Sequence, residues 1–128
     1  MTNYQKGARF ERDIVNELWE HGWAAIRAAG SGTVGFPVPD VIGIKDRKVI
    51  VIECKATRKD KINLKKAALS LKKLSDISKA RAYIAVKFYK KRPRFFDIET
   101  LISRGNYSVS SNDNHLSLDS ILGEQVTL

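Results

Sequence analysis

The sequence of residues 40–55 predicts that two carboxylates and a lysine lie close together. Alternation along a strand over residues 49–55 places Glu53 and Lys55 on one face and Ile52 and Cys54 on the other. Asp40 begins the preceding apolar run, and if the two runs pair as a hairpin, Asp40 and Glu53 lie at the same end of the sheet. Charged groups half-buried there need compensation, so the pattern predicts a bound cation or phosphate.

The donor types indicate which cation this site would prefer. Carboxylates that lie close together repel unless a cation lies between them, and hard oxygen ligands suit Mg²⁺ or Mn²⁺ better than zinc. Glu11 lies on the apolar side of a predicted helix and is a further candidate ligand. The alternatives are an ordinary Asp at the start of a strand, a Glu53–Lys55 pair, and a Glu11 that pairs with Arg12 or a lysine.

Hydrophobic periodicity predicts the elements that would carry these residues. They are a helix over 4–21, a strand over 23–28, a Gly- and Pro-rich mobile loop over 30–39, hairpin strands over 41–44 and 49–55, a helix over 64–75, strands over 82–88 and 94–98, a helical turn over 97–102, a surface loop over 108–114 and a terminal helix over 116–122. We expect an α/β protein with residues 1–128 forming a single domain, a central mixed β-sheet flanked by helices. Phe95 and Phe96 are adjacent, so one of them is expected at a dimer interface.

The net charge and the composition indicate which class of molecule the protein binds. The chain has a net charge of +9, and residues 45–94 hold 18 basic and 4 acidic side chains. Nucleic acid is therefore the leading partner, with a solvated basic face as the alternative. The single Cys54 excludes an intramolecular disulfide and a zinc-binding Cys cluster. A polar N-terminus and the lack of a long apolar run predict a cytoplasmic protein that does not enter membranes.

Several motifs together resemble a known nuclease group. Pro39-Asp40, twelve residues and then Glu53-Cys54-Lys55 is similar to the PD-(D/E)xK nuclease superfamily. A more specific resemblance, to the archaeal Holliday junction resolvases, is carried by residues 6–12, by Arg27 followed by Gly30-Ser31-Gly32, by residues 37–42 and by residues 52–55. It covers residues 6–74 in motifs.

This resemblance implies a restriction-endonuclease-like fold, with residues 1–128 as one nuclease domain, and a homodimer that cuts two opposed strands of a four-way DNA junction during recombination and repair. It implies that Glu11, Asp40 and Glu53 hold Mg²⁺, with Mn²⁺ as a substitute, and that no small-molecule cofactor is used. Lys55 would assist the attacking water, and Ser31 would act near the scissile phosphate. One departure is Lys66-Ala67-Ala68, where family members often carry a Glu-Gln pair.

Basic residues near these motifs are the candidates for phosphate contacts, which position DNA without reading its sequence. They are Lys6, Arg9, Arg12, Arg27, Arg58, Lys59, Lys61, Lys65 and Lys66. Two other functions remain open on sequence alone. One is a nuclease of the same fold that acts on mismatched, flapped or duplex DNA, and the other is a non-catalytic DNA-binding module.

Overall fold

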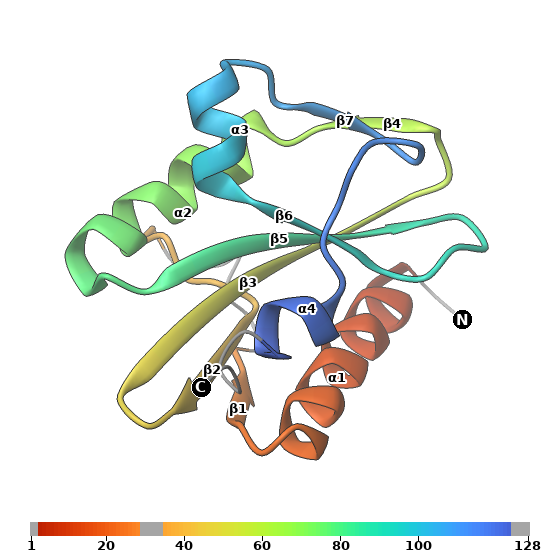
Figure 1. Ribbon diagram of the computed structural model, residues 1–128. Coiled ribbons are helices and arrows are strands. Elements are labelled where there is room, and N and C mark those ends of the chain that lie inside the picture. Colours follow the sequence, from red (N-terminus) through yellow and green to blue (C-terminus); the bar gives the residue numbers. More distant parts are fainter. Residues whose placement is uncertain (1–2, 29–34, 124–128) are drawn as a thin grey trace.

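A five-stranded mixed sheet forms the centre of the computed structural model, which describes residues 3–28 and 35–123 (Figure 1). Its strand order is β1-β2-β3-β5-β6, and only β3 and β5 pair in parallel. The strands are β1 (Ala24–Arg27), β2 (Val41–Lys45), β3 (Lys48–Thr57), β5 (Arg81–Phe88) and β6 (Arg94–Asp97). No helix within the described ranges is long and apolar enough to cross a membrane.

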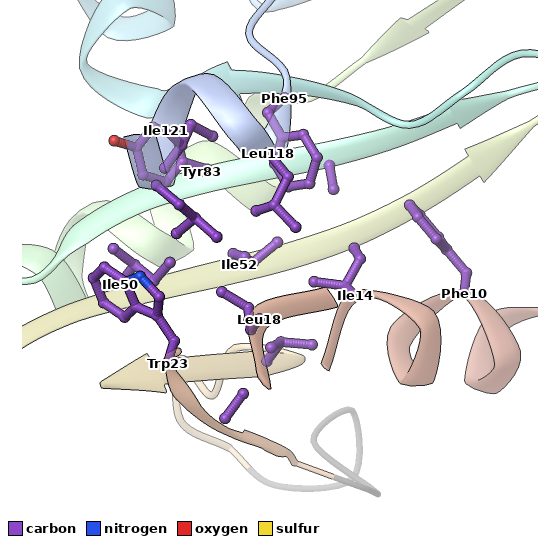
Figure 2. Close-up of a cluster of buried hydrophobic side chains, with 14 residues drawn as sticks. Phe10, Ile14, Leu18, Trp23, Ile50, Ile52, Tyr83, Phe95, Leu118 and Ile121 are labelled. Carbon is purple, nitrogen blue, oxygen red and sulfur yellow. The ribbon is translucent and has the colours of Figure 1, made fainter. Parts of the chain in front are cut away.

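Helices cover both faces of this sheet, which confirms the predicted fold class. They are α1 (Asn3–Glu20), α2 (Lys65–Ser78), α3 (Ile98–Arg104) and α4 (Leu118–Gly123). Helices α1 and α4 pack on one face through a cluster that includes Leu18, Trp23 and Ile52 (Figure 2). Helices α2 and α3 pack on the other face, where the second cluster includes Val51 and Leu71. The alternation of β3 thus supplies both halves of the core.

The β2–β3 hairpin has the two-residue turn that its register requires. Lys45 pairs with Lys48, and the two residues between them, Asp46 and Arg47, have φ values of 49° and 68°. Such positive φ values at both central positions are typical of a type I′ turn, whose twist matches the strands. Gly43 in β2 leaves room for Ile50, because a Cβ at residue 43 would lie 3.1 Å from the Ile50 Cγ1 atom.

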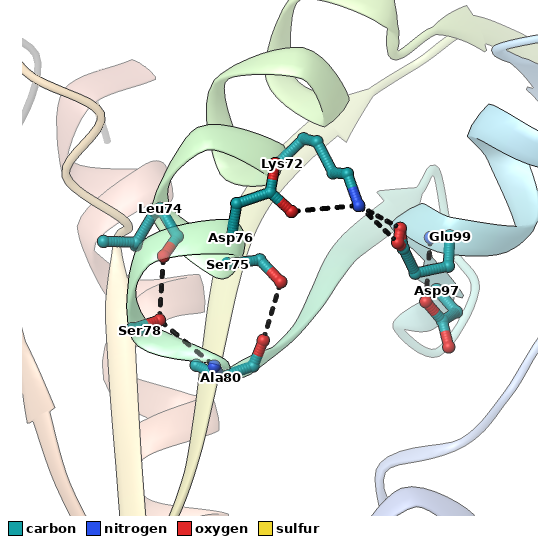
Figure 3. A network of polar contacts seen from close by, with 8 residues as sticks. All are labelled: Lys72, Leu74, Ser75, Asp76, Ser78, Ala80, Asp97 and Glu99. Carbon is teal, nitrogen blue, oxygen red and sulfur yellow. Dashed lines mark hydrogen bonds and ion pairs between the residues drawn. The ribbon is translucent and has the colours of Figure 1, made fainter.

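Polar contacts fix the end of α2 and join it to α3 (Figure 3). The Lys72 ammonium group donates to Glu99 of α3 at 2.8 Å and lies 3.1 Å from Asp76. The Ser75 hydroxyl donates to the carbonyl of Ala80 at 2.8 Å, just past the end of the helix. Helix α2 is therefore anchored at the point where the chain returns into β5.

Two expectations from the sequence were wrong. Residues 108–114 were expected to form only a surface loop, but β7 (Ser108–Ser110) pairs with β4 (Lys61–Asn63) in a second, two-stranded sheet. Phe95 and Phe96 are both buried, with 2% and 6% of their surface exposed. Because they point to opposite faces of β6, each joins a different core cluster, so neither lies at a surface available for a dimer interface.

Candidate active site

Asp40 and Glu53 lie side by side, as the predicted hairpin requires. Val41 pairs with Ile52, which places Asp40 opposite Glu53 at the open end of the hairpin. The backbone N–H of Asp40 donates to the carbonyl of Ile52 at 3.1 Å, and the N–H of Cys54 donates to the Asp40 Oδ2 atom at 2.8 Å. These two bonds flank Glu53 on both sides. The position of Asp40 relative to β3 is thus fixed by its backbone and by its side chain.

Negative charge at this pair is only partly neutralised. Burial and the nearby Asp40 charge raise the pKa of Glu53 from its ordinary value of 4.5 to about 7, and Lys55 opposes that rise. The Lys55 Nζ atom lies 4.0 Å from the Glu53 Oε2 atom, and both side chains are partly buried. An approaching cation would therefore relieve carboxylate repulsion.

Glu11 of α1 lies near enough to Asp40 for the two charges to interact. Its pKa is raised by burial and by the charge of Asp40, whereas Arg27 lowers it. The Arg27 Nε atom donates to the Glu11 Oε1 atom at 2.9 Å, and both side chains are about four-fifths buried. Arg12 is exposed. The partner of Glu11 is therefore the strand residue Arg27 and not Arg12 or a lysine.

The oxygen donors suit a hard cation, although they do not form a complete ligand set. Within residues 3–28 and 35–123, no three His, Cys, Asp or Glu side chains are grouped so that they could hold a metal ion. Asp40 and Glu53 present neighbouring carboxylates, while Glu11 is bound to Arg27. A cation at this pair would need further ligands from water or phosphate, as Mg²⁺ usually does. The ligand roles of Glu11, Asp40 and Glu53 remain predictions.

Comparison with known proteins places this geometry in a family. The model of the archaeal Holliday junction resolvase family, Hjc, matches residues 2–127. The chain belongs to this family. It is 40% identical over 99 residues to the crossover junction endodeoxyribonuclease Hjc of Archaeoglobus fulgidus, covering 75% of this chain and 71% of that protein. The Hjc of Sulfurisphaera tokodaii is 34% identical over 113 residues, with 84% and 78% covered.

A solved Hjc structure has the same fold. The Archaeoglobus fulgidus Hjc, described as a Holliday junction resolvase from an archaeal hyperthermophile, superposes with a TM-score of 0.78 at 32% identity. The match covers 91% of this chain and 98% of that structure. It confirms the restriction-endonuclease-like fold that the sequence resemblance implied.

The other candidate residues of this Hjc-family chain differ in how the structure places them. Ser31 lies outside the described residues, as does the side chain of Lys6. Burial raises the pKa of the Cys54 thiol, with the charges of Asp40 and Glu11 adding to the effect, so Cys54 is unsuited to act as a thiolate nucleophile. The remaining candidates for DNA contact, apart from the paired Arg27, are exposed: Arg9, Arg12, Arg58, Lys59, Lys61, Lys65 and Lys66.

The raised pKa of Glu53 predicts how stability depends on pH when no metal is bound. The unfolded chain releases this proton near pH 4.5 and the folded chain near pH 7, so the folded state binds more protons between those values. The free energy of unfolding contributed by Glu53 is therefore highest below pH 4.5 and falls as the pH rises through 7. Glu53→Gln removes this fall, and at pH 8 we expect it to be more stable than the unmodified chain by roughly 2–3 kcal/mol.

Urea unfolding of the unmodified chain and of Glu53→Gln, in EDTA at pH 4.5 and at pH 8, would measure this difference. Equal stabilities at pH 8 would show that Glu53 is not destabilised by its surroundings.

Proposed function

We propose that this chain is a structure-selective endonuclease that binds four-way DNA junctions as a homodimer and cuts two opposed strands. The observation that carries the proposal is the grouping of Asp40, Glu53 and Lys55 at one end of the β2–β3 hairpin. Two carboxylates and an ammonium group that are partly buried together suit phosphodiester hydrolysis. The relatives named as crossover junction endodeoxyribonucleases support the choice of substrate.

Magnesium is the cofactor that the donor set supports, with manganese as a substitute. Asp40 and Glu53 would hold the ion, because their carboxylates come from positions that lie opposite each other, and Glu11 would join them if Arg27 moved to the DNA. When bound, the ion would neutralise phosphate charge and stabilise charge that develops on the reacting oxygens. No small-molecule cofactor takes part in the proposed reaction.

The remaining residues bind and orient the substrate. Lys55 holds a positive charge 4.0 Å from Glu53, where it can attract the scissile phosphate and stabilise its added negative charge. Arg27 is partly buried beside Glu11 and offers its remaining N–H groups to a phosphate oxygen. We retain Ser31 as a candidate near the scissile phosphate, on the family resemblance alone. Exposed cations around the site would bind the DNA arms.

Cleavage of matched DNA substrates tests this function directly. In Mg²⁺ we expect paired, symmetric nicks in a labelled immobile four-way junction, because two active sites of a dimer act on opposed strands. We expect little cutting of a linear duplex, a flap or splayed DNA of the same sequence, and no cutting in EDTA. Equal cutting of duplex would retain the nuclease and reject junction selectivity. Junction binding without cutting in any metal would favour the non-catalytic DNA-binding module.

A further inference from the structure

A basic cluster surrounds Tyr89 in the turn that joins β5 to β6. It consists of Arg58, which follows β3, together with Tyr89, Lys90, Lys91 and Arg92, and we call it the Tyr89 cluster. All five side chains are exposed. The Arg58 guanidinium carbon lies 4.6 Å from the centre of the Tyr89 ring, and the Lys90 Nζ atom lies 5.3 Å from it. One half-exposed aromatic ring thus has two cations against it.

The positive charge of the Tyr89 cluster is not neutralised by carboxylates. In the part of the chain that the structure describes, none of its four cations takes part in an ion pair. Lys72 differs, because Asp76 and Glu99 both bind it. A cation–π contact stabilises a side-chain position but leaves the charge in place. The partner that this cluster fits is therefore a polyanion.

The backbone of this turn is held in one shape. The N–H of Lys91 donates to the carbonyl of Phe88 at 3.0 Å, and the Lys87 ammonium group donates to the carbonyl of Lys91. Lys90 has a φ of 60°, a left-handed conformation that Gly or Asn adopts more easily. The turn therefore presents several cations from a fixed backbone, which lowers the conformational entropy lost on binding.

The Tyr89 cluster adjoins the candidate active site. Lys55 pairs with Val86 and Thr57 with Phe88, so Arg58 and Tyr89 begin where the two parallel strands end. Arg58 follows Lys55 by three residues, about 10 Å along an extended chain. Figure 1 shows the β5–β6 turn at the end of the sheet toward which β3 runs. A DNA strand held at Lys55 would continue over this turn.

We propose that the Tyr89 cluster is a second DNA-contacting site, which binds phosphates of the duplex arm next to the cut. Arg58, Lys90, Lys91 and Arg92 contact the phosphates, and Tyr89 is a positioning residue that holds the Arg58 guanidinium toward them. This inference rests on the proposed function, since it needs a DNA substrate. It adds the β5–β6 turn to the surface and gives Tyr89 a role that is distinct from packing.

The salt dependence of junction binding tests the phosphate contacts. The variant Lys90→Gln, Lys91→Gln, Arg92→Gln removes three charges from the turn. A matched control, Lys45→Gln, Arg47→Gln, Lys48→Gln, removes two lysines and one arginine from the opposite end of β3. Binding of a labelled four-way junction is measured in EDTA between about 50 and 200 mM salt.

In the turn variant we expect the slope of log K against log salt to decrease by about 2 to 3, and affinity to fall by about tenfold or more. The control should keep the slope of the unmodified chain. If the unmodified chain binds and both variants keep its slope, or both lose it equally, the cluster assignment is overturned while the proposed function stands. If the unmodified chain does not bind the junction, the proposed function fails, and this inference fails with it.

Two substitutions of one residue test the positioning role of Tyr89. Tyr89→Phe keeps the aromatic face for Arg58, whereas Tyr89→Ala removes it. We expect Tyr89→Ala to weaken junction affinity and raise KM by about two- to fivefold with kcat unchanged, and Tyr89→Phe to match the unmodified chain. Equal affinities for the alanine and phenylalanine variants would overturn the positioning role.

Discussion

Replacing Glu53 with Gln is expected to lower the single-turnover rate of junction cleavage by at least about a hundredfold to a thousandfold, with junction affinity changed little. The substitution removes a negative charge and one of the two carboxylates that would hold the cation, while Asp40 keeps its bond to the backbone of Cys54. Rate and affinity are measured separately, by quenched cleavage with enzyme in excess and by binding in EDTA.

Glu20→Gln is the matched control, because it makes the same chemical change at an exposed position at the end of α1. It should cut at the rate of the unmodified chain. A Glu53→Gln protein that still cuts at that rate would exclude the proposed site. If junction affinity fell as much as the cleavage rate, Glu53 would instead act in folding or in DNA binding.

Trp23→Ala is expected to lower the free energy of unfolding by about 3–5 kcal/mol, the largest effect on stability that we predict. Trp23 is 1% exposed and packs beside Leu18 and Ile50, at the point where the chain passes from α1 into β1 (Figure 2). Removing the ring leaves a cavity between the helix and the sheet. It also loosens the start of the strand that carries Arg27 to Glu11.

Trp19→Ala is the comparison variant, because it removes the same kind of side chain four residues earlier, in α1. Trp19 is 58% exposed, and its indole N–H donates to the carbonyl of Ala25 at 3.0 Å. Its removal should cost about 1 kcal/mol or less. Urea unfolding of both variants measures the difference, and similar losses for the two would contradict the burial on which the prediction depends.

The main elements could be predicted because their hydrophobic patterns are long. The helical period of α1 and the alternation of β3 each involve several buried residues. The two-residue turn at Asp46 and Arg47 leaves little freedom in how β3 pairs with β2. Strands β4 and β7 have three residues each, with Val109 as their one buried side chain. Three residues do not establish a period, so the second sheet could not be predicted.

The part of the candidate site that the sequence could predict is the part that the β2–β3 hairpin forms. The pairing of Asp40 with Glu53 follows from register, which local sequence determines. The ion pair between Glu11 and Arg27 depends on how α1 packs against β1, and no periodic signal specifies that contact. The contact of Arg58 with Tyr89 likewise depends on the parallel pairing of β3 and β5, whose partners are far apart in sequence.

The two-residue turn at Asp46 and Arg47 has a consequence for how genes of this family can change. Side chains alternate along β3, so a one-codon insertion or deletion that shifted its register would exchange the face that bears Ile50 and Ile52 with the face that bears Val51, Glu53 and Lys55. Such an event would destroy folding and catalysis at once, whereas a two-codon change would conserve the facing of every residue. Evolution along this hairpin is therefore expected to favour substitutions and even-numbered length changes.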